Sequence, residues 1–309
     1  MPDIAVVVVA YRSAATLELC LASILADANT RVIVVDNSSD PDTRRLCALV
    51  AKTHPGRLIY DDPGVNLGYA KASNRGLAAL EPFELVAVVN PDVALDRSLS
   101  ELAAIPEFEP ADVIAGRLRS PGSARSLNAR PRVSIAREFG KALFGSRIYS
   151  QPELVVPDGR VHQVDQLDGA LLLLSAVTWR RLGGFDERFE LYYEDVDLCS
   201  RVRQMGRCLL ANAPWGAHVG GHSFKRSDGR AFVALRVSRT RFALKWWHPE
   251  ALARIAVLSV AVVEWLVRSI TRQSEGQVIR SLALRRVAAE LVDPGSQHSL
   301  NELAREPIK

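Results

Sequence analysis

Apolar runs and helical repeats alternate along the first part of the chain. Residues 4–10 form an unbroken, valine-rich run, which is typical of a strand buried on both faces of a parallel sheet. Residues 13–25 then place leucine and isoleucine on one helical face, and residues 31–35 form a second apolar run that ends at Asp36. This order predicts a doubly wound α/β layer.

The alternation continues beyond Asp36. Asp40 is expected to cap a helix, because the Pro41 that follows it suits the first helical position. The next segments predict a weak strand, a helix and a strand at residues 57–60, 69–80 and 85–89. Further on, an apolar run that reaches Leu174 predicts a second group of buried strands.

Polar residues follow three of the predicted strands. They are Ala10-Tyr11-Arg12, Asp36-Asn37-Ser38-Ser39 and Asn90-Pro91-Asp92. Ligands of doubly wound sheets bind at the carboxyl ends of the strands, where these three segments lie. Any one of them alone is an ordinary polar loop, but together they predict a nucleotide site. The first of these turns has no glycine, and the chain has no P-loop, which disfavours a dinucleotide oxidoreductase and a P-loop phosphotransferase.

A dense group of acids lies in residues 183–206. Glu194, Asp195 and Asp197 fall within four residues, ahead of an apolar helical repeat that Gly206 is expected to end. A helix N-terminus tolerates negative charge, so each acid alone could be a cap. Three acids so close compete for protons, and at least one is expected to reach a pKa that suits a proton acceptor. Asp197 is expected to cap the helix or to hold a basic residue four positions on.

The charge of the chain narrows the choice of partners. Its net charge is +4 and its pI is near 9.0, which favours nucleotides, lipid phosphates or an anionic membrane surface; nucleic acid is not expected. Residues 117–147 are strongly basic against a single acid, Glu138. This stretch is either a solvated basic loop or a surface that contacts the phosphates of a substrate, on the side where an acceptor molecule would bind.

The four cysteines have neither the paired spacing nor the partners of a metal site. They are expected to be buried thiols in a reducing compartment. The first apolar run has no basic segment before it, so no signal peptide is expected.

The character of the chain changes at residue 230. Basic residues precede Trp246-Trp247, and residues 251–267 are largely apolar with two charges inside. This run is short and interrupted for a membrane span, and it fits a helix lying in the membrane interface. Helices packed on the catalytic domain or on a partner subunit are the alternative. The predicted division is a catalytic domain at 1–229, a helical membrane-proximal appendage at 230–292 and a flexible tail at 293–309.

Five motifs in order resemble family 2 glycosyltransferases with the GT-A fold, over about residues 4–225. They stand at residues 6–12, 34–39, 66–76, 90–92 and 183–206. Within the family, the chain resembles bacterial rhamnosyltransferases that act on polyprenyl-diphosphate-linked sugars. The resemblance implies a doubly wound, mostly parallel, Rossmann-like sheet with a C-terminal helical appendage.

The resemblance also implies roles for single residues in binding a nucleotide sugar. Asp36 would recognise the base of the donor, with Ala10 and Tyr11 lining that pocket. Asn66 and Lys71 would lie near the nucleotide and its phosphates. The remaining donor-side residues are Asn90, Asp92 and Asp168, the last of them near the sugar or the acceptor.

Catalysis and metal binding follow from the same resemblance. Asp195, the second acid of its cluster, would be the catalytic base, with Glu194 and His222 on the acceptor side. Asp92 and His218 would hold a divalent cation, Mg²⁺ or Mn²⁺, on the donor diphosphate. Asn90 stands where the family carries the first carboxylate of its metal motif, so the affinity for the metal is expected to be modest.

The reaction expected from this resemblance is inverting transfer of a sugar from a nucleotide donor, with dTDP-rhamnose as the first choice. The acceptor would be a polyprenyl-diphosphate-linked saccharide of cell-wall or polysaccharide assembly, at the cytoplasmic face of the plasma membrane. Another donor, such as UDP-galactofuranose or a UDP-hexose, and a non-catalytic nucleotide-sugar-binding subunit are the alternatives. The oligomeric state is open, a homodimer included.

Overall fold

The computed structural model describes residues 2–120, 123–126, 128–134, 137, 138, 140, 159–218, 230–270 and 277–293. Its contacts divide the chain into two units. The first unit is residues 1–131, 153–187 and 194–221, and the second is residues 132–152, 188–193 and 222–309. The second unit thus holds the segment predicted as an appendage together with two segments from the middle of the chain.

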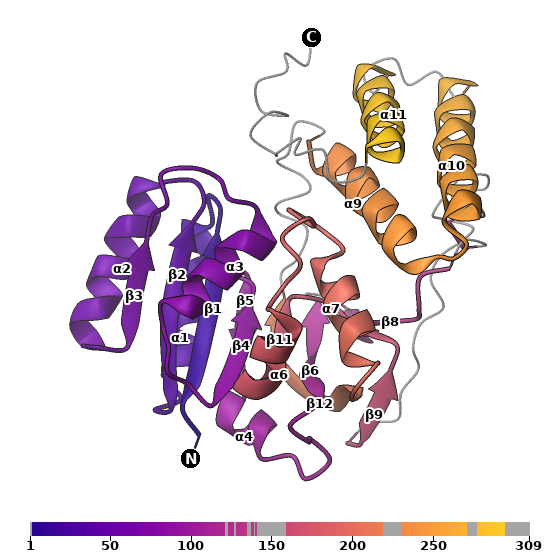
Figure 1. The fold of residues 1–309 in the computed structure, drawn as a ribbon. Coiled ribbons are helices and arrows are strands. Elements are labelled where there is room, and N and C mark those ends of the chain that lie inside the picture. The colour runs from indigo at the N-terminus through magenta and orange to yellow at the C-terminus, as the bar shows by residue number, and fades with distance from the viewer. Residues whose placement is uncertain are drawn as a thin grey trace. The chain divides into compact units, whose positions relative to one another are not determined.

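One mixed sheet organises the first unit (Figure 1). Its strands follow the order β3 (Leu58–Asp61), β2 (Thr30–Asp36), β1 (Ile4–Ala10), β4 (Leu85–Val89), β11 (Leu171–Ser175), β6 (Val113–Ser120), β12 (Cys208–His218) and β5 (Val93–Leu95). Strand β7 (Ser123–Ser126) pairs with β6, and β9 (Val161–Val164) pairs with β12. Strands β8 (Ala129–Arg130) and β10 (Gln166–Leu167) form a separate small sheet.

The amino-terminal part of this sheet is parallel, as its buried apolar runs predict. β1 pairs in parallel with β2 and β4, and β2 pairs in parallel with β3. β11 is antiparallel to both β4 and β6, so a strand from late in the chain joins the parallel half to the rest. The loops after the parallel strands therefore meet the loop that precedes β11 at one edge of the sheet.

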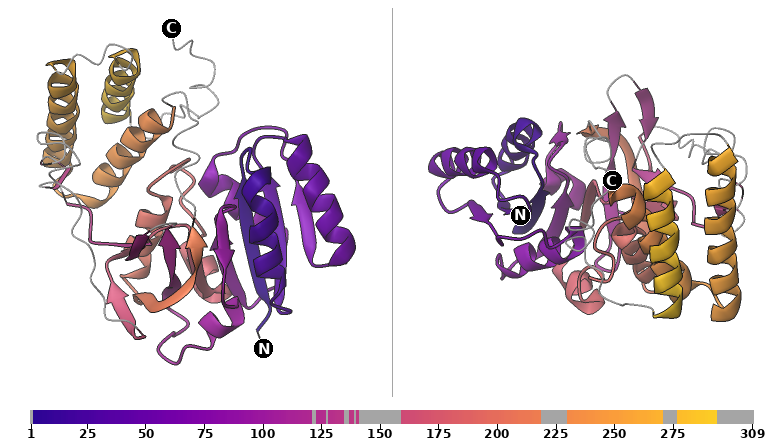
Figure 2. Two further views of the ribbon diagram at one scale, coloured as in Figure 1. Left: turned by 180° about the vertical axis from the view of Figure 1, so that it is seen from behind. Right: turned by 90° about the horizontal axis from the view of Figure 1, so that it is seen from above.

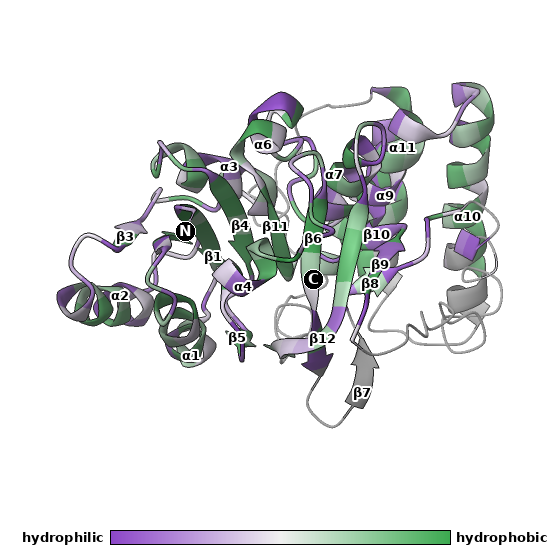
Figure 3. Cartoon of the chain, turned by 90° about the horizontal axis from the view of Figure 1, so that it is seen from below, coloured by the Kyte–Doolittle hydropathy of each residue, from purple (hydrophilic) through white to green (hydrophobic). Residues whose placement is uncertain are grey.

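Successive residues of β1 belong to two hydrophobic cores, one on each face of the sheet. Val7 packs with residues of α3 (Tyr69–Ala78), α6 (Ala176–Leu182) and α7 (Glu194–Val202). Val8 packs on the other face with residues of α1 (Ala14–Leu25), α2 (Pro41–Thr53) and α4 (Leu99–Ala103). Figure 2 gives two further views of these helices, and Figure 3 shows β1, β4 and β11 as strongly hydrophobic. Burial on both faces explains the continuous apolar runs.

Two local predictions about helix ends have different outcomes. Asp40 caps α2 as predicted, because its side chain accepts hydrogen bonds from the backbone N–H groups of Asp42 and Thr43. The prediction for Gly206 is wrong: α7 ends at Val202, and Gly206 is not among the residues with positive φ. A Cβ at Gly206 would come within 2.1 Å of the Ala111 carbonyl oxygen, so close packing requires glycine there.

The burial of the cysteines agrees with the prediction from the sequence. All four are free and buried: Cys20, Cys47, Cys199 and Cys208. Burial raises the pKa of the Cys20 thiol strongly and that of Cys47 to about 12, so neither is a ready thiolate at neutral pH.

The described part of the second unit contains the helices α9 (Arg230–Trp246), α10 (Glu250–Ile270) and α11 (Gln277–Val292). Ala243 of α9, Val257 of α10 and Val287 of α11 share one apolar cluster. Ion pairs join Arg241 to Glu290 at 3.0 Å and Arg239 to Glu138 at 3.2 Å. Among the described residues, no helix has the length and apolar character to cross a membrane. The predicted tail beyond residue 293 lies outside the described residues.

Candidate active site

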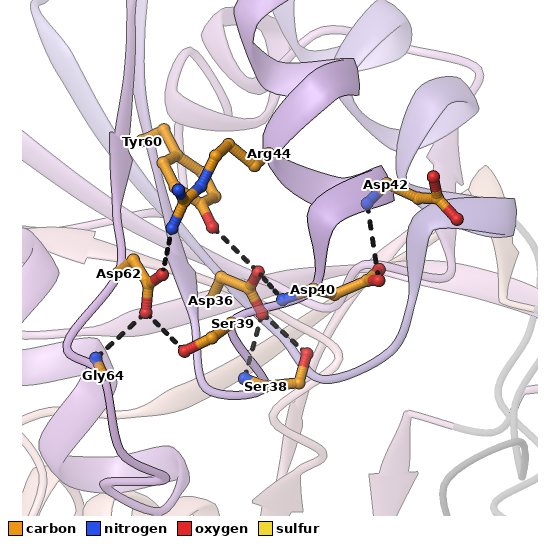
Figure 4. A network of polar contacts seen from close by, with 9 residues as sticks. All are labelled: Asp36, Ser38, Ser39, Asp40, Asp42, Arg44, Tyr60, Asp62 and Gly64. Carbon is orange, nitrogen blue, oxygen red and sulfur yellow. Dashed lines mark hydrogen bonds and ion pairs between the residues drawn. The ribbon is translucent and has the colours of Figure 1, made fainter.

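The loop after β2 is built around the buried carboxylate of Asp36 (Figure 4). Oδ1 accepts hydrogen bonds from the Ser38 N–H at 3.0 Å and the Ser38 hydroxyl at 2.7 Å. Oδ2 accepts from the Asp40 N–H at 2.8 Å and from the Tyr60 hydroxyl at 3.0 Å. Four donors on one fully buried carboxylate fix the backbone of this loop.

A second carboxylate continues the same network toward solvent. Asp62 accepts hydrogen bonds from the Ser39 hydroxyl at 2.7 Å and the Gly64 N–H at 2.9 Å, and its ion pair with Arg44 spans 2.6 Å. The Ser39 hydroxyl, then the Gly64 N–H and the Arg44 guanidinium, hold the pKa of Asp62 below its usual value. The whole loop is thus preformed by donors that favour charged carboxylates.

The other predicted nucleotide-side residues surround this loop. Ala10 lies beside Asp36 in the register of β1 and β2 and is buried, whereas Tyr11 is 45% exposed. The side chain of Asn66 accepts a hydrogen bond from the Gly68 N–H at 2.9 Å, and Lys71 is exposed on α3. Asn37, a member of the polar segment that follows β2, joins this loop to the segment before α3: its amide donates to the Gly68 carbonyl at 3.0 Å.

The loop after β4 meets the end of β12. His218 pairs with Val93 in the register of β12 and β5, which brings its imidazole to Asp92. His218 Nε2 and Asp92 Oδ1 are 3.1 Å apart, and both side chains are largely buried. The predicted partners Asp92 and His218 are therefore in direct contact, although they are more than a hundred positions apart in the sequence.

Asn90 faces a different neighbour. Its Oδ1 accepts a hydrogen bond from the Tyr69 hydroxyl at 2.9 Å, and the same hydroxyl lies 3.2 Å from the Gly169 carbonyl oxygen. Burial, then the charges of Glu194, Asp195 and Asp92, raise the pKa of Tyr69 well above its usual value. The hydroxyl therefore remains a donor, and its surroundings place three predicted site acids in one neighbourhood.

The predicted base is held by backbone donors. Asp195 Oδ2 accepts a hydrogen bond from the Gly169 N–H at 2.8 Å, and Oδ1 accepts from the Val196 N–H at 2.8 Å. The first bond joins the start of α7 to the segment before β11, and a Cβ at Gly169 would lie 3.4 Å from the Asp195 Cβ. Asp195 is therefore placed by main-chain groups of two separate segments.

Asp168 is the neighbouring carboxylate and pairs with Arg130, with 2.7 Å between Nε and Oδ1. Burial raises the pKa of Asp168 to about 6; the Arg130 charge opposes this effect, and the nearby Asp195 charge adds to it. Asp168 thus changes its protonation close to neutral pH. Arg130 belongs to the basic stretch of the sequence, but nothing local distinguishes it from the other arginines there.

The remaining acids of α7 differ from Asp195. Glu194 is buried, and among the described residues its Oε2 has no hydrogen-bond partner. Burial, and then the Asp195 charge, raise the pKa of Glu194 well above its usual value. Asp197 is fully buried and pairs with Arg201 at 2.7 Å, which confirms the predicted partner four positions on. His222 lies outside the described residues.

Two central residues of this cluster, Tyr69 and Gly169, do not stand out in the sequence as site residues. Tyr69 lies inside the motif at 66–76, and Gly169 follows Asp168 directly, so both stood beside predicted residues. Their importance comes from contacts across the sheet, which link Tyr69 to Gly169 over 100 positions.

Comparison with known proteins places this site in a family. The sequence pattern of glycosyl transferase family 2 matches residues 5–164. A low-salt glycan biosynthesis hexosyltransferase of Haloferax volcanii, Agl10, is 26% identical over 279 residues, or 86% of this chain and 84% of the relative. An N-acetylglucosaminyl-diphospho-decaprenol L-rhamnosyltransferase of Mycobacterium tuberculosis is 32% identical over 226 residues, or 65% of this chain and 70% of the relative.

Solved structures share the architecture. GalNAc-T7 with UDP, GalNAc and Mn²⁺ matches with a TM-score of 0.56 and 11% identity, covering 96% of this chain and 58% of that one. S. aureus TarS 1–349 with UDP-GlcNAc matches with a TM-score of 0.53 and 16% identity, covering 94% and 81%. This likeness concerns the fold, and the predicted GT-A fold is confirmed. The chain belongs to glycosyl transferase family 2 and is a glycosyltransferase.

Proposed function

We propose that this glycosyltransferase is inverting and moves L-rhamnose from dTDP-rhamnose to a lipid-linked saccharide in cell-wall or polysaccharide assembly. One observation carries the chemical part: the Tyr69 hydroxyl lies 2.9 Å from Asn90 Oδ1, in the loop that contains Asp92, and 3.2 Å from the carbonyl oxygen of Gly169, whose N–H donates to Asp195. A group for the leaving diphosphate and a group for the acceptor are thus within one loop cluster. The M. tuberculosis rhamnosyltransferase supports the choice of sugar and the lipid-linked acceptor.

Asp195 is the catalytic base in this proposal. Its carboxylate accepts the proton of the acceptor hydroxyl, and the acceptor oxygen attacks the anomeric carbon from the side opposite the diphosphate. Two backbone N–H groups hold the two carboxylate oxygens, which fixes the direction in which Asp195 presents its free lone pairs. Burial, and then the Asp195 charge, raise the pKa of Glu194, which disfavours a second negative charge beside Asp195.

A divalent cation fits the pair of Asp92 and His218. Mn²⁺ accepts carboxylate and imidazole ligands, and Mg²⁺ is commonly held by one or two carboxylates together with substrate phosphates. In the described part of the chain no group of three or more His, Cys, Asp or Glu residues could hold a metal by itself. Asp92 and His218 would therefore share the cation with the donor, and when bound it neutralises charge on the leaving diphosphate.

The donor is tested by thermal denaturation against a panel of nucleotide sugars, each with and without Mg²⁺ or Mn²⁺. A ligand that binds the folded protein raises its melting temperature by mass action, so dTDP-rhamnose with metal should give the largest shift. A larger shift with UDP-galactofuranose or a UDP-hexose would show that this sugar, and not rhamnose, is the donor, and the proposal of inverting transfer would stand. Slow hydrolysis of the preferred donor by the purified protein would exclude the non-catalytic binding subunit.

We also propose that the second unit binds the anionic surface of the membrane that carries the acceptor, which is the cytoplasmic face of the plasma membrane. One side of α10 packs inward through Ala253, Val257 and Val260. The other side exposes a row of large apolar side chains, each between 37% and 62% exposed: Leu252, Ile255, Leu258, Val262 and Leu266. An apolar row facing outward is the reverse of an ordinary surface helix.

Charge supports a lipid surface as the occupant of this row. Residues 230–292 contain eleven Lys and Arg against four Asp and Glu, a net charge of +7 in a chain whose total is +4. The remainder of the chain is therefore net negative, so the positive charge lies in the same segment of the sequence as the apolar row. Basic charge with exposed apolar side chains is the combination that holds interfacial helices on anionic lipids.

The full-length protein tests this with vesicles of phosphatidylglycerol and phosphatidylcholine. The double variant Ile255→Glu/Leu258→Glu should bind at least about tenfold more weakly, because two apolar side chains lose their burial in lipid. Leu19→Glu is a matched control on α1, where Leu19 is 68% exposed in the first unit, and it should bind as the wild type does. Unchanged vesicle binding of the double variant would overturn the membrane proposal. If the double variant instead converts a dimer to a monomer, the apolar row is an interface with a second copy of the chain.

A further inference from the structure

The Tyr69 hydroxyl stands at a junction that the proposed chemistry does not yet use. It lies on the first residue of α3, within reach of the loop after β4 through Asn90 and of the segment before β11 through Gly169. The Tyr69 ring packs against Phe185, with 6.2 Å between ring centroids. The ring thus has a packing role that phenylalanine could fill, whereas the hydroxyl makes hydrogen bonds that phenylalanine would lose.

The segment that Tyr69 reaches is held residue by residue. The Asp168 N–H donates to the Asn128 carbonyl at 3.1 Å, and the Ala170 carbonyl accepts from the Asn90 N–H at 3.0 Å. Between them, the Gly169 N–H donates to Asp195, and the Gly169 carbonyl oxygen, at 3.2 Å, shares the single Tyr69 O–H with Asn90 Oδ1, at 2.9 Å. The peptide groups on both sides of the Gly169 Cα are therefore bound, one by the predicted base and the other by Tyr69.

Glycine makes this restraint important. Without a Cβ, Gly169 has a wide choice of backbone angles, and a turn of one neighbouring peptide is readily passed to the other. If the carbonyl of Gly169 is released, its N–H can lose alignment with Asp195 Oδ2. Catalytic groups work within narrow limits of position, so a small misalignment of the base lowers the rate of the chemical step.

We propose that Tyr69 is a positioning residue for Asp195, acting through Gly169 and Asn90. The inference rests on the proposed role of Asp195 as base and adds to it a residue that does not touch the reacting atoms. The burial of the hydroxyl among three acids keeps it protonated, so the restraint persists across the working pH range.

The first test is a double-mutant cycle on the full-length enzyme. Tyr69→Phe alone should lower kcat about tenfold, the equivalent of one lost hydrogen bond, with the donor KM nearly unchanged. In an Asp195→Asn background the same change should cost almost nothing further, because its route to the reaction is already lost. Ser73→Ala is the matched control, since it removes a buried hydroxyl whose hydrogen bond, 2.9 Å long to the Tyr69 carbonyl oxygen, lies within α3.

The second test does not depend on activity. Hydrogen exchange of the amides of residues 168–171 should become about tenfold faster in Tyr69→Phe and stay unchanged in Ser73→Ala, with β1 equally protected in both. Additive losses in the cycle, or unchanged exchange at 168–171, would overturn the role of Tyr69 and leave the base assignment intact. An Asp195→Asn variant of normal rate would instead overturn the proposed function.

Discussion

Two groups of carboxylates lie at the same edge of the sheet, and their surroundings shift carboxyl pKa values in opposite directions. Around Asp36, donors surround each acid, and the pKa of Asp62 is held low, first by the Ser39 hydroxyl. Around Asp195 the acids crowd one another: burial raises the pKa of Asp168 to about 6 and that of Glu194 well above its usual value. We call the first group the Asp36 loop (residues 36–40 and 60–64) and the second the acid cluster (Asp168, Glu194 and Asp195).

This difference in electrostatic environment suggests different tasks: the Asp36 loop holds a fixed conformation, and the acid cluster transfers protons. In the Asp36 loop, hydrogen-bond donors hold the side-chain oxygens of Asp36 and Asp62, so the loop keeps one conformation and suits the recognition of a rigid ligand such as a base. In the acid cluster, burial raises the pKa of Asp168 and of Glu194, so the charged forms of these two acids are penalised and Asp168 exchanges its proton close to neutral pH. Charge counts alone would not distinguish the two groups.

The largest expected effect is on the acid cluster. Asp195→Asn removes the proposed base and should lower the transfer rate about a hundred- to ten-thousandfold. Binding of the donor, measured by calorimetry, should be retained, because the base contacts the acceptor. Glu194→Gln should be milder, since burial raises the pKa of Glu194 and so disfavours the charged form that a proton acceptor needs. A larger loss in Glu194→Gln than in Asp195→Asn would reverse the assignment of the two acids.

The metal pair comes next in size. Asp92→Ala should lower transfer about a hundredfold or more, because a cation on a leaving diphosphate contributes several kcal/mol and each 1.36 kcal/mol is tenfold in rate. Wild-type transfer should also stop in excess chelator and return with Mn²⁺ or Mg²⁺. Full activity in chelator would show that Asp92 and His218 form a hydrogen-bonded pair without a metal.

The third prediction compares the pH dependence of the two groups. The folded pKa of Asp168 is about 6, against about 3.9 in an unfolded chain, so the native state holds an extra proton between these values. Stability should therefore fall as pH rises from about 4 to 6, and Asp168→Asn should remove that fall. Asp62 has a lowered pKa, so its contribution is present above the unfolded pKa and is lost as pH falls.

Thermal denaturation from pH 3 to pH 8 measures both signs in one series. Asp62→Asn should be destabilising at pH 7 and closer to neutral at pH 3, whereas Asp168→Asn should be relatively more stabilising at pH 7 than at pH 4. Equal pH slopes for the two variants would contradict the contrast between the Asp36 loop and the acid cluster.

Local signals made much of this structure predictable from the sequence. The run at Ile4–Ala10 and the strand Leu85–Val89 have the predicted bounds, because strands buried on both faces need continuous apolar residues. The cap at Asp40 was predictable since capping depends on adjacent residues. These features need no knowledge of the rest of the fold.

The contacts that make the site depend on strand order and could not be predicted. β11 lies beside β4, which brings Gly169 to Tyr69 and Asp195, and nothing in the sequence encodes that neighbourhood locally. The resemblance named Asp92 and His218 as a pair, and the pairing of β12 with β5 is what brings them into contact. Gly206 shows the limit of local reasoning, because a packing contact with Ala111 explains the glycine that a helix end was expected to need.

The smallest effect is expected in the Asp36 loop, where Tyr60→Phe removes one of the four donors on Asp36. Burial is the first cause that raises the pKa of Tyr60 to about 12, so its hydroxyl is a constant donor. The Asp40 N–H still bonds the same oxygen, so the expected loss is about 1–2 kcal/mol of stability. In a domain of this size that loss corresponds to a melting temperature lower by about 2–8 °C.

Tyr60→Phe should also raise the KM for the nucleotide donor, because the loop that it loosens is the one proposed to read the base. Its effect on kcat at saturating donor should be small beside that of Tyr69→Phe, since no contact joins Tyr60 to the acid cluster in the bonds described for it. Steady-state kinetics of the two variants side by side compare one tyrosine hydroxyl from each group. If Tyr60→Phe lowers kcat as much as Tyr69→Phe and leaves KM alone, the division into a loop for shape and a cluster for proton transfer is wrong.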